Sequence, residues 1–94
     1  MSNLTTLSKM NNWKNLIESE FLSRGEDFTK MITTLTDEEL NQRFDDGYGR
    51  ICGKPFTAWG EKYVYFPVSQ DGAEWVESAP RHICGEPTKH IGII

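Results

Sequence analysis

Two cysteines and two histidines are the residues of this 94-residue chain whose types could support metal binding or nucleophilic catalysis. Cys52 and Cys84 each lie in a run of the form Ile-Cys-Gly-X-Pro, and His82 and His90 flank the second run. A four-ligand zinc site made of these residues is therefore one alternative. The usual pair of cysteines separated by two residues is missing, which favours two buried structural cysteines instead.

Catalysis by a cysteine would require Cys52 or Cys84 beside a histidine and an orienting group, and no known motif surrounds either thiol. The neighbouring acids at 37–39 are explained by the start of a helix, and those at 45–46 by a helix end before a turn. No phosphate-binding glycine pattern appears. The leading interpretation is therefore a protein that is not an enzyme, with no catalytic residue, metal ligand or cofactor.

Aromatic residues in the second half of the chain are the strongest candidates for binding. Tyr63 and Tyr65 alternate with Val64, Phe66 and Val68 along a predicted strand. We expect the second set to form the core face beneath the helices, and the tyrosines to lie on the open side with a tryptophan from a neighbouring strand. The predicted protein-binding residues are Trp59, Tyr63, Tyr65, Trp75 and, at the rim, Arg81.

The charge pattern bears on the kind of partner. Residues 1–47 carry nine acids against five bases, residues 48–94 carry five of each, and the net charge is −4. A nucleic-acid-binding protein needs a concentrated positive field, which is missing here. Stacking of the aromatic residues on a single-stranded nucleic acid is therefore the weaker alternative, and plain cross-strand packing of the same residues is a further one.

The first half of the chain has the periodicity of helices. A helix is predicted from an asparagine cap at position 11 or 12 to a stop at Gly25. A short second helix is predicted after Asp27. The run Thr36-Asp37-Glu38-Glu39 is a capping box, so a third helix is predicted from there to a glycine at 47 or 49, with Phe44 facing inward.

Beyond residue 47 the pattern changes to short β-type runs between glycine, proline and aspartate breaks. Gly60-Glu61 is predicted to form a two-residue hairpin loop and Ser69–Gly72 a second turn. Pro67 is predicted to mark an edge or the end of a strand, because proline cannot donate to the ladder. Strands are predicted at 56–59, 63–66 and 74–77, with a fourth at 50–52.

The sequence as a whole predicts one α+β domain, with two or three short N-terminal helices packed on a three- to four-stranded antiparallel β-meander. Residues 1–10 are expected to form an arm, residues 11–94 the domain, and the chain from about 79 a loop-like tail. No secretion signal and no apolar stretch long enough to span a bilayer is apparent. We therefore expect a cytoplasmic protein with reduced thiols and no membrane contact.

The run GKPFTAWGEKYVYFPV at 53–68, followed by DGAEWV at 71–76 and PRH at 80–82, resembles small uncharacterised accessory proteins of enterobacterial phages and prophages. The resemblance covers about the second half of the chain and implies no site residue. Such genes often encode stoichiometric inhibitors. The resemblance therefore implies a non-catalytic binding protein that blocks a host or defence protein of a restriction, CRISPR or nuclease pathway. The target and the oligomeric state stay open.

Overall fold

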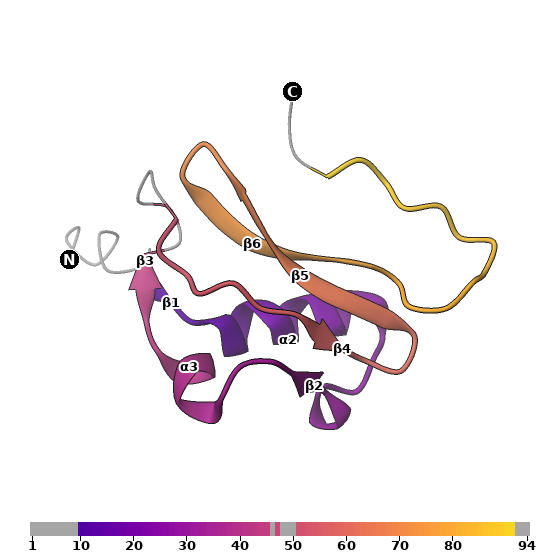
Figure 1. Ribbon diagram of the computed structural model, residues 1–94, viewed down its shortest axis with the longest axis horizontal. Coiled ribbons are helices and arrows are strands. Elements are labelled where there is room, and N and C mark those ends of the chain that lie inside the picture. Colours follow the sequence, from indigo (N-terminus) through magenta and orange to yellow (C-terminus); the bar gives the residue numbers. More distant parts are fainter. Residues whose placement is uncertain (1–9, 46, 48–50, 92–94) are drawn as a thin grey trace.

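A computed structural model describes residues 10–45, 47 and 51–91 of the chain (Figure 1). Its α+β class and antiparallel strands confirm the predicted fold class, although the numbers of helices and strands differ from the prediction. None of the helices within these ranges is long and apolar enough to cross a membrane. The elements are β1 (Met10–Asn11), α2 (Trp13–Arg24), the 3₁₀ turn η1 (Phe28–Lys30), β2 (Ile32–Thr33), α3 (Asp37–Asn41), β3 (Phe44–Asp45), β4 (Ala58–Trp59), β5 (Tyr63–Gln70) and β6 (Ala73–Pro80). The predicted arm lies, except for Met10, outside the described residues.

Helix α2 begins and ends where its capping residues predict. The side chain of Asn12 accepts a hydrogen bond from the backbone of Asn15, which satisfies one of the amides that a helix start leaves unpaired. Gly25 follows the helix in the left-handed conformation, with φ of 71°. The buried face of α2 consists of Trp13, Ile17 and Phe21.

The second and third predicted helices need correction. Asp27 caps only the single turn η1, and the chain then turns into β2. The capping box is confirmed, because Thr36 and Glu39 each accept from the other's backbone, but α3 ends at Asn41. Phe44 does not continue this helix, since it pairs in β3 with Asn11 of β1 and its ring lies 4.9 Å from that of Trp13.

Four strands form the main sheet, in the order β2-β4-β5-β6 with antiparallel neighbours. The Asp71-Gly72 turn joins β5 to β6, with φ of 51° and 87°, as in the turn type that suits a two-residue hairpin loop. The β4–β5 connection has three residues, Gly60 to Lys62, rather than the predicted two. Of the predicted strand at 50–52, Ile51 and Cys52 are not in a strand, and Arg50 lies outside the described residues.

Pro67 lies inside β5 and does not end it. Within β5 only Val64 and Tyr65 pair with β4, so at Pro67 strand β5 has β6 alone as a neighbour in the sheet. A proline is tolerated there because one side of the strand is open, and its missing N–H leaves no ladder bond unmade on that side.

The core lies between α2 and one face of the sheet, as Figure 1 shows. The face predicted to be buried is the wrong one. Tyr65 is fully buried opposite Ala58, and its ring stacks on that of Phe21 at 4.1 Å, whereas Val64 and Phe66 point the other way. The buried cluster contains Trp13, Ile17, Phe21, Leu35, Leu40, Phe56, Ala58, Tyr65 and Val76.

Candidate protein-binding face

The sheet face that points away from the helices carries a group of apolar side chains, which we call the outer face. Residues directly opposite each other in an antiparallel pair share one face. Ile32 pairs with Trp59, which in turn pairs with Val64, and Val68 pairs with Trp75. Phe66 has the same alternation as Val64 and Val68. The large apolar side chains of the outer face are therefore Ile32, Trp59, Val64, Phe66, Val68 and Trp75, drawn from all four strands. Glu77 and Ala79 of β6 lie on the same face, opposite Phe66 and Val64.

The outer face is open to solvent in part. Ile32 is 63% exposed, and the other five side chains are half-buried. Helix α2 packs against the opposite side of the sheet (Figure 1). Single exposed apolar residues are ordinary on a protein surface, but a contiguous group from four strands is typical of an interaction surface.

Charged residues lie among and beside these apolar side chains, and Glu77 is directly opposite Phe66 on the outer face itself. The indole N–H of Trp75 donates to Glu77 at 2.8 Å, and Glu77 is paired with Lys89 at 3.4 Å. At the β4–β5 turn, Lys30 lies 3.9 Å from Glu61. The outer face therefore combines apolar side chains with a carboxylate on the edge strand β6.

Only two of the five predicted binding residues, Trp59 and Trp75, lie on the outer face. Tyr65 belongs to the core, where its hydroxyl donates to the carboxylate of Glu26 at 2.7 Å. Burial and this hydrogen bond raise the pKa of Tyr65 far above its ordinary value. A partner cannot reach this side chain in the folded protein.

Tyr63 and Arg81 also have partners within the chain. The ring of Tyr63 lies beneath the guanidinium of Arg24, 4.1 Å from it, and its hydroxyl donates to Glu86 at 2.7 Å. That bond and burial raise the pKa of Tyr63. Arg81 is exposed, but its side chain donates to the carbonyl of Gly60 at 2.8 Å and so braces the β4–β5 turn.

Sequence reasoning missed four residues of the outer face: Ile32, Val64, Phe66 and Val68. The alternation along β5 showed two sets of side chains but not which set was inside. In β6 the pattern was misleading, because Glu74 and Ser78 are buried on the core side while Trp75 is half-buried on the other. The one sequence feature that could have identified the outer face of β5 was the aromatic and β-branched character of Val64, Phe66 and Val68.

The four candidate zinc ligands are not brought together. The backbone of Cys52 donates to Glu74, near the start of β6. Cys84 lines a hollow together with Pro80, the last residue of β6. A strand of this length separates the two sites by roughly 20 Å. Both cysteines are exposed, so their predicted burial is also wrong. In the described ranges no cluster of three or more His, Cys, Asp or Glu residues could hold a metal ion.

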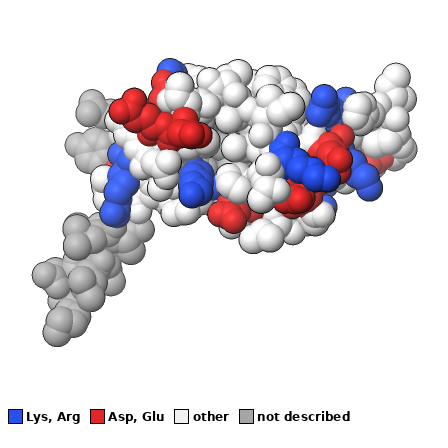
Figure 2. All heavy atoms as spheres, turned by 90° about the horizontal axis from the view of Figure 1, so that it is seen from below, with Lys and Arg blue, Asp and Glu red and all other residues white. Residues whose placement is uncertain are grey.

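The surface charge at the α3 and β2 edge of the molecule is mixed. Figure 2 views the molecule from the edge where α3 and β2 lie in Figure 1, and shows acidic and basic side chains scattered among neutral ones. One acidic group comes from the first turn of α3, which carries Asp37, Glu38 and Glu39. This side does not offer the continuous positive surface on which a nucleic acid backbone would bind.

Comparison of the chain with protein-family models, curated proteins and solved structures yields no match.

Proposed function

We propose that this chain is a non-catalytic protein that acts by binding another protein through the outer face. The observation that carries the proposal is the group of partly exposed apolar side chains on the sheet, opposite the helices. Two of them are tryptophans, the residue type that most often anchors protein interfaces. The resemblance to phage accessory proteins supplies the partner class: a host or defence protein, whose activity the bound chain blocks.

The size of the surface agrees with binding to a larger partner. The eight-residue strands β5 and β6 extend for about 26 Å and are together about 10 Å wide, and β2 and β4 widen the sheet only over a length of about 7 Å. Because β2 and β4 have only two residues each, the outer face offers about 300 Å², less than the roughly 800 Å² that each partner contributes to a standard interface. A partner would also contact charged residues on and beside the edge strand β6, among them Glu77 and Lys89.

Affinity measurements with outer-face variants test this function. The tagged wild-type chain and its Trp75→Ala variant are used to capture proteins from an enterobacterial host, and the affinity of each captured protein is then measured. A true anchor loses at least about 2 kcal/mol of binding on truncation, roughly thirtyfold in Kd. The circular dichroism spectrum should stay that of the wild type.

Leu22→Ala is the matched control, because Leu22 is 72% exposed on α2, on the other side of the molecule. This variant should bind as the wild type does. If no captured protein distinguishes Trp75→Ala from Leu22→Ala, the outer face is not the binding surface.

A further inference from the structure

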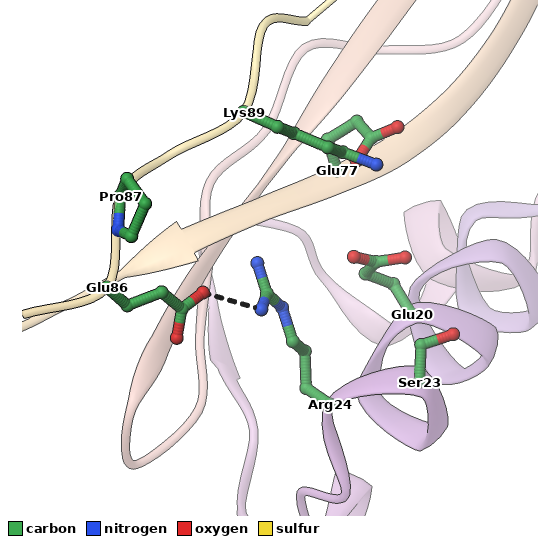
Figure 3. A pocket seen from close by; sticks show the side chains of 7 residues that line it. All are labelled: Glu20, Ser23, Arg24, Glu77, Glu86, Pro87 and Lys89. Carbon is green, nitrogen blue, oxygen red and sulfur yellow. Dashed lines mark hydrogen bonds and ion pairs between the residues drawn. The ribbon is translucent and has the colours of Figure 1, made fainter.

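The C-terminal tail, residues 81–91, lies on the surface and touches the folded body through a few side chains. Every one of these residues is exposed. After Pro80 the tail turns back, so that Glu86 reaches Arg24 of α2 and Lys89 reaches Glu77 of β6 (Figure 3). The tail therefore depends on individual contacts for its position, since it has no buried face of its own.

The side chain of Arg24 is fixed by residues of the body. Its Nε donates to the hydroxyl of Ser78 at 2.7 Å, and a terminal nitrogen donates to the Ser78 carbonyl at 3.1 Å. The Ser78 hydroxyl in turn donates to Glu20 at 2.7 Å, and the guanidinium lies over the ring of Tyr63. Because none of these contacts uses the tail, Arg24 keeps its orientation when the tail is elsewhere.

The carboxylate of Glu86, in the tail, accepts hydrogen bonds from two donors of the folded body, Arg24 and Tyr63. The Nη1 of Arg24 donates to one oxygen of Glu86 at 2.8 Å, and the hydroxyl of Tyr63 donates to the other at 2.7 Å. The Tyr63 hydrogen bond and the nearby guanidinium lower the pKa of Glu86. Both carboxylate oxygens are thus bound by groups from two separate elements, as a ligand would be.

We propose that Arg24 and Tyr63, oriented by Ser78, form a carboxylate-binding site, and that Glu86 makes the C-terminal tail a displaceable strap across it. A partner that presents a glutamate or aspartate side chain could take the same two donors. This goes beyond the proposed function, because it concerns a second site and does not require the outer face.

The partial exposure of the Arg24–Glu86 ion pair agrees with a tail that can detach from the body of the protein. The side chains of Arg24 and Glu86 are 25% and 37% exposed, and partly exposed ion pairs hold their partners weakly. The strap also borders a hollow of about 350 Å³ that Tyr63 and Pro80 line together with the tail's Cys84. Displacing the strap would uncover the apolar wall of that hollow.

The first experiment compares the full-length wild type with Glu86→Ala by NMR. In the wild type, backbone relaxation at Gly85, Thr88 and Lys89 should report an ordered tail. In Glu86→Ala the same amides should become mobile on the nanosecond timescale, while those of β5 and β6 keep their shifts. Glu61→Ala, at another exposed glutamate, should leave the tail ordered. A tail that is equally ordered in Glu86→Ala, or already mobile in the wild type, overturns the strap.

The second experiment tests whether the vacated site takes a carboxylate. The probe is a blocked peptide with the sequence of residues 85–89, Gly-Glu-Pro-Thr-Lys, added at about 10 mM, the range expected for one charge-assisted contact pair. The shift of the Arg24 Nε–H signal should be at least about threefold larger in Glu86→Ala than in the wild type, whose own tail competes. Equal shifts in the two proteins, or equal shifts with a Gln-for-Glu peptide, overturn the site.

Discussion

At the scale of single residues, three glutamates account for much of how this chain holds its loops. Glu74 accepts from the backbone of Cys52 and Gly53, and Glu26 accepts from the Tyr65 hydroxyl and the backbone of Lys62. Glu86 bridges Arg24 and Tyr63. Each carboxylate joins segments that are distant in sequence, so these acids are structural, and their number need not indicate a basic partner.

Glu74 should be the most important of the three for stability, because it is only 5% exposed. Glu74→Ala leaves two backbone N–H groups without their acceptor, which should lower the free energy of unfolding by about 3 kcal/mol. Urea denaturation measures this change. The exposed Glu61→Ala should change the same quantity by less than about 0.5 kcal/mol, and equal losses in the two variants would argue against the role given to Glu74.

Tyr65 should make the stability of the fold depend on alkaline pH. Its pKa is raised in the folded protein by burial and by the bond to Glu26, while in the unfolded chain it is about 10. The stabilisation is therefore fully present below pH 10 and is lost as the pH rises further toward the folded pKa. Unfolding measured between pH 8 and 11.5 should show a fall that is smaller in Tyr65→Phe. A Tyr65 phenol that titrates near pH 10 in the native state would contradict this.

At the scale of elements, the sequence predicted those features that depend on local chemistry. The Asn12 cap, the Gly25 stop and the Thr36–Glu39 capping box are present, and of the turn predicted at 69–72 the last two residues, Asp71 and Gly72, form the turn. Each of them depends on hydrogen bonds or φ angles within a few residues, so one segment contains the necessary information.

Features that depend on distant segments were predicted less well. The two-residue strand β2 exists because it pairs with β4, about 25 positions later, and no local signal outweighed the helical pattern around it. The buried face of β5 was predicted wrongly for the same reason, because its burial depends on residues distant in the sequence. The burial of Tyr65 depends on Phe21 and Glu26 of the first half, which supply a stacking ring and a hydrogen-bond acceptor.

The face assignment makes a direct prediction for stability. Tyr65→Ala removes a fully buried ring and should lower the free energy of unfolding by roughly 3–5 kcal/mol. Phe66→Ala, one position along the same strand, removes a half-buried ring from the outer face and should cost clearly less. Urea denaturation of both variants decides the matter. A larger loss for Phe66→Ala would mean that the two faces of β5 are reversed.

At the scale of the whole molecule, the fold is a two-layer arrangement with helix α2 on one side of a sheet and apolar side chains on both. The inner side is covered by α2, and the outer face has no helix of the described ranges over it. Antiparallel sheets commonly leave one face to solvent, and that face is then usually polar. On this protein the outer face instead carries two tryptophans and a phenylalanine, which is the central reason to propose a protein partner.

Site-specific photo-crosslinking in cells tests that claim most directly. A photoreactive phenylalanine analogue is placed at Phe66 on the outer face and, as a control, at Leu22, which is 72% exposed on α2. After irradiation in an enterobacterial host, Phe66 should give a discrete adduct with another protein, and Leu22 should give none of the same mass. Equal adducts at the two positions, no adduct at Phe66, or an adduct of only two copies of this chain would contradict the account.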